Sequence, residues 1–136
     1  MSLTLLAIAA AAATHTTHIE HRGASVEAIY SARTDIRMRT VGAHTPNRMD
    51  NRRCQWTATV IIERQLSGKP VLARTLHGDR PLSGSQSGPC TAGTRAIDRE
   101  IAHRDDAIQA QLLAVAERDR APLLAELDAV HNMASN

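Results

Sequence analysis

The segment CQWTATVIIE, residues 54–63, limits the possible folds of this chain more than any other stretch. Its alternate residues are apolar, and the residues between them are mostly polar. This period of two is typical of a β-strand with one buried and one exposed face. The segment contains the only Trp of the chain and one of its two Cys. It therefore predicts a core strand whose buried face carries Cys54, Trp56, Ala58, Val60 and Ile62.

Similar alternation predicts three further strands. The four strands span about residues 16–21, 26–41, 53–66 and 71–77, with turn-forming residues between them. Alternating runs joined in this way favour an antiparallel β-meander of three or four strands. Residues 78–93 are rich in Gly, Ser and Pro and have almost nothing to bury, so we expect a loop there.

The apolar period changes after Thr94. Ile97, Ile101, Ile108 and Leu112 recur at helical spacing and predict an amphipathic helix over about residues 95–120. Pro122 predicts a kink or break, followed by a second helical segment over about residues 122–131. One apolar helix stripe complements one apolar sheet face, so the sequence predicts an α+β fold in which residues 13–136 form a single small domain.

The N-terminus predicts export. Residues 1–13 are uncharged and apolar and end in consecutive Ala, which favours a signal peptide over residues 1–12. The run is too short to span a bilayer, and no transmembrane span is expected. Arg supplies every basic residue except Lys69, a bias that we attribute to a GC-rich bacterial genome. In the periplasm or outside the cell, two cysteines favour a disulfide between Cys54 and Cys90.

The charge distribution argues against nucleic-acid binding. The net charge of +2 combines a basic body with an acidic end, because residues 94–136 carry five Arg against eight acidic residues. The two ends of the chain can therefore neutralise each other. Trp56 and Tyr30 are the only aromatic residues, so stacking platforms for bases are lacking. We expect no nucleic-acid partner.

Two clusters are candidate sites. His15, His18 and His21 are residue types that ligate copper, nickel or zinc. A spacing of three directs the middle His away from the others in a strand, so we favour a solvated polar segment and expect no cofactor. Arg33, Arg37 and Arg39 share one strand face, and with Arg53 they predict a stripe for acidic partners. Solubility and protection of a sheet edge explain the same stripe more simply.

No catalytic motif is present, and no catalytic residue is predicted. The favoured function is that of an exported, non-enzymatic domain that binds an unknown protein or envelope component. The alternative is a metal-binding accessory protein that uses the His cluster. A small hydrolase with an unrecognised site ranks third.

Overall fold

The structure is a computed structural model, and it describes residues 13–69 and 72–135. The predicted signal peptide, residues 1–12, lies outside the described residues. The same holds for residues 70–71, so the first residue of the fourth predicted strand, residue 71, is not described.

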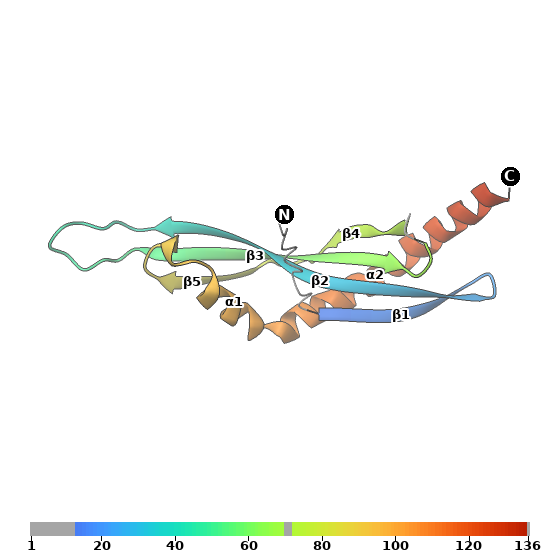
Figure 1. Cartoon of the computed structure of the whole chain (residues 1–136), viewed down its shortest axis with the longest axis horizontal. Helices are drawn as coiled ribbons and strands as arrows, with labels where there is room; N and C mark the ends of the chain where they lie inside the picture. The colour runs from blue at the N-terminus through green and yellow to red at the C-terminus, as the bar shows by residue number, and fades with distance from the viewer. Residues whose placement is uncertain (1–12, 70–71, 136) are drawn as a thin grey trace, which may run out of the picture.

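A twisted antiparallel sheet forms one layer of the molecule. The strands follow the order β1-β2-β3-β4, and a fifth strand pairs with β3 as well. Because β2 occupies one edge of β3, β4 and β5 share the other edge, β4 beside residues 61–64 and β5 beside residues 53–58. Figure 1 shows β2 and β3 crossing near the middle of the sheet. The strands are β1 (Ala13–His21), β2 (Ala24–Val41), β3 (Arg53–Leu66), β4 (Arg74–His77) and β5 (Leu82–Ser87).

The prediction of a loop over residues 78–93 is wrong in part, because β5 lies within it. Leu82 is buried opposite Ala58, and Gly84 lies opposite Trp56. A Cβ atom on Gly84 would lie 2.5 Å from the Trp56 ring, so this glycine permits close packing on the indole. The strand has few apolar residues because the free edge of β3, rather than side-chain burial, holds its backbone.

The break between the two helices also differs from the prediction. Helix α1 (Arg95–Ala102) and helix α2 (Asp105–Ala134) are separated at residues 103–104, and α2 continues through Pro122. Proline costs a helix one backbone hydrogen bond. Here Leu123 and Leu127 are buried against the sheet on the C-terminal side of Pro122, and this packing keeps the helix continuous.

The helices cover one face of the sheet and enclose the core. Trp56 is 1% exposed and lies in this core, as its position on the apolar face of β3 predicts. The disulfide between Cys54 and Cys90 is present and joins β3 to a short 3₁₀ helix, η2 (Cys90–Ala92). We call the opposite side of the sheet, which carries the odd-numbered residues of β3, the open face. The α+β fold class is confirmed.

Candidate binding surface

The four arginines of the predicted stripe lie on the open face. In the register of the sheet, Arg37 lies beside Thr57, and Ser83 follows on β5. Arg39 lies beside Gln55, and Ser85 follows. Strand pairing therefore places the guanidinium groups next to hydroxyl and amide groups, a combination that can donate several hydrogen bonds to an anion.

Three of these arginines differ from the fourth in their ion pairs. Arg33 pairs with Glu63 at 3.3 Å. Among the described residues, no carboxylate lies within 4.0 Å of the other three arginines. Two of them are oriented by neutral groups, since Arg53 Nε donates to Ser85 Oγ at 2.9 Å and Arg39 Nη2 donates to Gln55 Oε1 at 3.4 Å. We call this surface the basic face; it consists of Arg37, Arg39, Arg53, Gln55, Thr57, Ser83 and Ser85.

The acidic residue of the adjacent loop does not neutralise the basic face. Asp50 accepts hydrogen bonds from the side chain and backbone of Arg52. The side-chain hydrogen bond from Arg52 is the main reason that the pKa of Asp50 falls to about 2. This carboxylate is therefore already paired within its own loop. The basic face keeps its positive charge.

The three candidate histidines do not converge. His15 and His21 point to the helix side of β1, whereas His18 is on the open face, where its Nε2 lies 3.4 Å from Glu27 Oε2. His21 Nε2 is 2.8 Å from Asp128 Oδ1 on α2. Within residues 13–69 and 72–135, no three His, Cys, Asp or Glu side chains are arranged to hold a metal ion.

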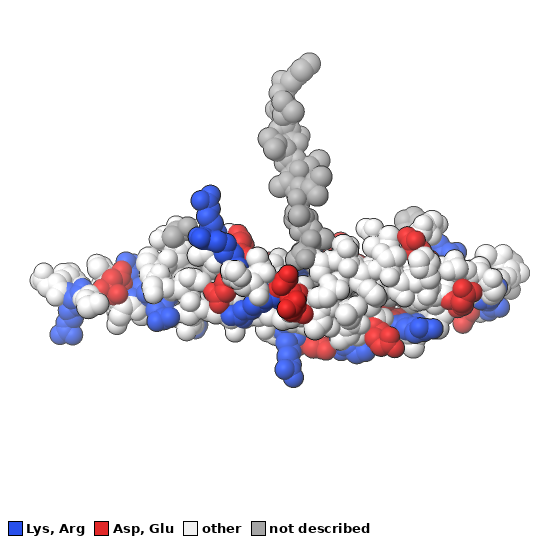
Figure 2. Space-filling view, turned by 90° about the horizontal axis from the view of Figure 1, so that it is seen from below, with Lys and Arg blue, Asp and Glu red and all other residues white. Residues whose placement is uncertain are grey.

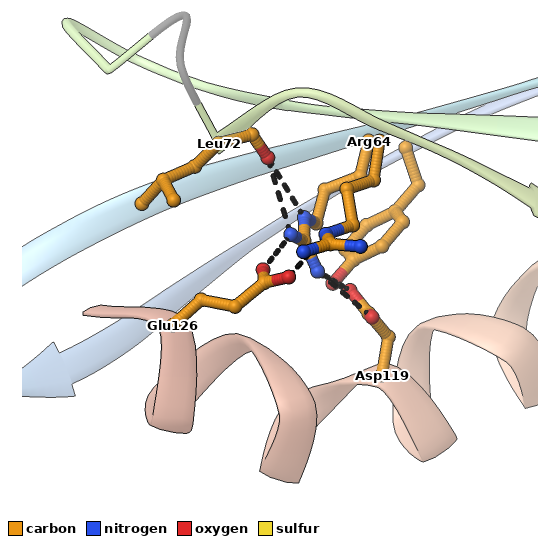
Figure 3. Close-up of polar contacts among 6 residues, drawn as sticks. Arg64, Leu72, Asp119 and Glu126 are labelled. Carbon is orange, nitrogen blue, oxygen red and sulfur yellow. Dashed lines mark hydrogen bonds and ion pairs between the residues drawn. The ribbon is translucent and has the colours of Figure 1, made fainter. Parts of the chain in front are cut away.

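A buried ionic cluster, which the sequence reasoning missed, lies between β3 and α2 (Figure 3). Arg64 is fully buried, and its Nη1 donates to both carboxylate oxygens of Asp119 at 2.8 and 2.7 Å. It also donates to the Leu72 carbonyl and to Glu126. The Tyr30 hydroxyl donates to Asp119 Oδ2 at 2.7 Å, and Arg74 Nε pairs with the other side of Glu126, so both residues belong to the cluster.

The chemistry of this cluster is that of a structural junction. Burial would lower the pKa of Arg64, but its bonds to Asp119 and Glu126 raise it overall. Burial, together with the hydrogen bond to Asp119, raises the pKa of the Tyr30 hydroxyl above its usual range. Both shifts keep Arg64 and Tyr30 protonated at neutral pH. The cluster joins the sheet to α2 through buried hydrogen bonds and ion pairs.

The side of the molecule in Figure 2 shows basic and acidic side chains interspersed along its length. No large area of a single sign is visible on that side. No helix among the described residues has the length and apolar character needed to cross a membrane.

Comparison with known proteins adds no relative. No protein-family model, no curated protein sequence and no solved structure matches this chain. The basic face and the buried cluster are therefore interpreted from their own chemistry.

Proposed function

We propose that this chain is an exported, non-enzymatic domain that binds an acidic partner, a protein or an envelope component, through its basic face. One observation carries the proposal. Arg37, Arg39 and Arg53 lie together on the sheet, and none of them has a carboxylate partner among the described residues.

The spacing of these groups suits a repeating anion. Arg37 and Arg39 are two residues apart on one strand, which separates their side chains by about 7 Å. Arg53 lies on the next strand and is diagonal to Arg39, again at about 7–8 Å. An extended polymer with regularly spaced carboxylates can contact all three guanidinium groups at once. The surrounding hydroxyl and amide groups add neutral hydrogen bonds.

The disulfide supports export, because such bonds persist in oxidising compartments. The intact mass of the protein recovered from a bacterial periplasm tests this part. We expect loss of residues 1–12 and the absence of free thiols. A mass that retains Met1, or two free thiols, would contradict export.

Binding is tested with poly-L-glutamate of defined length at low and physiological salt. Arg37→Gln combined with Arg39→Gln removes two exposed charge interactions of about 0.5–1 kcal/mol each, so we expect a roughly 5- to 30-fold weaker Kd. The matched control is Arg95→Gln with Arg99→Gln on helix α1, which removes the same charge elsewhere. Equal weakening in both variants would show that only net charge matters, and it would refute the basic face.

A further inference from the structure

We infer that the outer edge of β2, residues 33–41, accepts an extended acidic segment of a partner protein as an additional β-strand. This inference deepens the proposed function: it rests on an acidic partner and on the loss of residues 1–12 at export, and it adds the manner of binding. Three observations support it: the topology of the sheet, the side chains on the two faces of β2, and the contacts that fix residues 33–41 in an extended conformation.

Among the described residues, half of β2 has only one neighbouring strand. The described part of β1 starts at Ala13, opposite Ala32, and covers residues 24–32 of β2. Residues 33–41 pair with β3 on their inner side, and no strand among the described residues lies on their outer side. Figure 1 shows β2 as the outer strand at this end of the sheet. These nine residues include no Pro or Gly, so their outward N–H and C=O groups form a regular template for another strand.

This edge is already fixed in an extended conformation. Its inner side is hydrogen-bonded along β3, and Thr40 lies opposite Cys54 of the disulfide. The backbone N–H of Cys90 donates to Thr40 Oγ1 at 3.0 Å, which ties η2 to the end of β2. An incoming strand therefore loses little free energy in ordering the acceptor, and this preorganisation favours binding.

The side chains beside the edge indicate the chemistry of the incoming strand. On the open face, Arg37 and Arg39 have no carboxylate partner among the described residues, so an added strand should carry Asp or Glu there. On the helix side, Ile36 is partly exposed and Met38 is 39% exposed, so apolar residues should alternate with the acidic ones. Main-chain pairing supplies affinity in such complexes, and the alternate side chains supply specificity.

A second copy of this chain fits the edge less well. Two β2 edges related by a two-fold axis and centred on Arg37 would pair Asp35 with Arg39 of the copy at two places, but they would also place Arg37 opposite its own copy and bring two edges of net positive charge together. The edge carries Arg33, Arg37 and Arg39 against the single Asp35, and like charges directly opposite destabilise strand pairing. An acidic strand therefore complements this edge better than the edge complements itself.

Capped nine-residue peptides test the inference by titration calorimetry with the whole chain. The probe alternates Glu with Val. Two further versions carry N-methyl groups, one on every Glu amide and the other on every Val amide, and a fourth peptide has Lys in place of Glu. Only one set of amides can face β2 in an added strand. We expect one methylated peptide to bind at least tenfold more weakly, the other to retain its affinity, and the Lys peptide not to bind.

Three results would overturn the strand addition. Equal binding of both methylated peptides would leave only an electrostatic contact with the basic face, and the proposed function would stand. The same conclusion would follow if poly-L-glutamate bound and the Glu–Val peptide did not. A dimer by light scattering that does not bind the Glu–Val peptide would assign the edge to a second copy. Conversely, peptide binding that is unaffected by Arg53→Gln while poly-L-glutamate binding fails would retain the edge and refute the wider basic face.

Discussion

The two ends of the sheet share strands β2 and β3, yet different interactions hold them. In the Arg64 half, which comprises β1, β4 and α2 with the adjoining parts of β2 and β3, a buried ionic cluster joins sheet and helix. The disulfide half comprises β5, η2 and α1 with the other parts of β2 and β3. Here the Cys54–Cys90 bond and the buried Trp56 hold the layers together instead of an ionic cluster. Tyr30 and Trp56, the only large aromatic side chains, are divided between the two halves.

The comparison shows two ways in which a chain with few aromatic residues fixes a thin core. In the disulfide half, α1 has only eight residues, and the crosslink limits the freedom of the unfolded chain. In the Arg64 half, buried charges add little net stability by themselves, but they make one alignment of helix and sheet much better than the others. The free edge of β2 lies in the disulfide half, where the backbone is held covalently.

The largest expected effect is the loss of Arg64. Arg64→Ala leaves the buried carboxylate of Asp119 without its cation, so the free energy of unfolding should fall by about 3–5 kcal/mol. Urea unfolding followed by Trp56 fluorescence measures it. Arg33→Ala is the control, because its half-exposed pair with Glu63 should contribute less than about 1 kcal/mol.

The double variant Arg64→Met with Asp119→Leu sharpens this prediction. Replacing both buried charges by apolar side chains should restore much of the stability. If Arg64→Ala costs under about 1 kcal/mol, the ionic cluster does not join the two layers.

The disulfide should have the next largest effect, and it should be local. Replacing Cys54 and Cys90 together by Ala should cost about 2–4 kcal/mol, because the unfolded chain regains its loop freedom. Hydrogen exchange should accelerate in β5, in η2 and at residues 33–41, but not in β1. Acceleration of similar size in β1 would contradict the division into two halves.

The smallest expected effect concerns Asp128, at the far end of the Arg64 half. The hydrogen bond from His21 is the main reason that its pKa lies below the usual value, and Arg22 contributes as well. A depressed carboxyl pKa gives stability that is present above the unfolded value of about 4 and is lost as pH falls through the folded value. The ring of His131 lies edge-on to the ring of His21, with 6.5 Å between the ring centroids.

Asp128→Asn should therefore lower the melting temperature slightly at neutral pH, and the difference from the parent chain should shrink as the pH falls below the unfolded value of about 4. Melting curves from pH 3 to pH 7 measure it. Glu117→Gln, on the exposed surface of α2, is the matched control. A difference that grows in acid would contradict the assigned role of the His21–Asp128 contact.

The sequence contains a pattern that indicates the buried cluster. Arg64 continues the even-numbered, apolar face of β3, two residues after Ile62. Asp119 occupies the helix stripe between Val115 and Leu123 at spacings of four. Two opposite charges at core-facing positions of two elements predict a buried pair. The partner of each charge, however, depends on how the helix is placed on the sheet, which periodicity does not determine.

The basic face was predictable in part, because the period of two in a strand determines which residues share a face. Strand parity placed Arg33, Arg37 and Arg39 on one side, and the structure keeps them there. The sequence could not show that Glu63 neutralises Arg33 while Arg37 has no acidic partner among the described residues. That difference arises from cross-strand register, since Glu63 is diagonal to Arg33 and Thr57 is opposite Arg37.

The sequence by itself determined the α+β class, the two long strands, the core position of Trp56 and the pairing of Cys54 with Cys90. Local periodicity is sufficient for the first three features, and the cysteine pairing follows from the count of two cysteines together with the predicted export. Tertiary structure alone decided that residues 82–87 form a strand, that α2 passes through Pro122, and that no strand among the described residues covers the outer side of residues 33–41. Each of these depends on a neighbour distant in the sequence: the edge of β3, the sheet beneath Leu123 and the described part of β1.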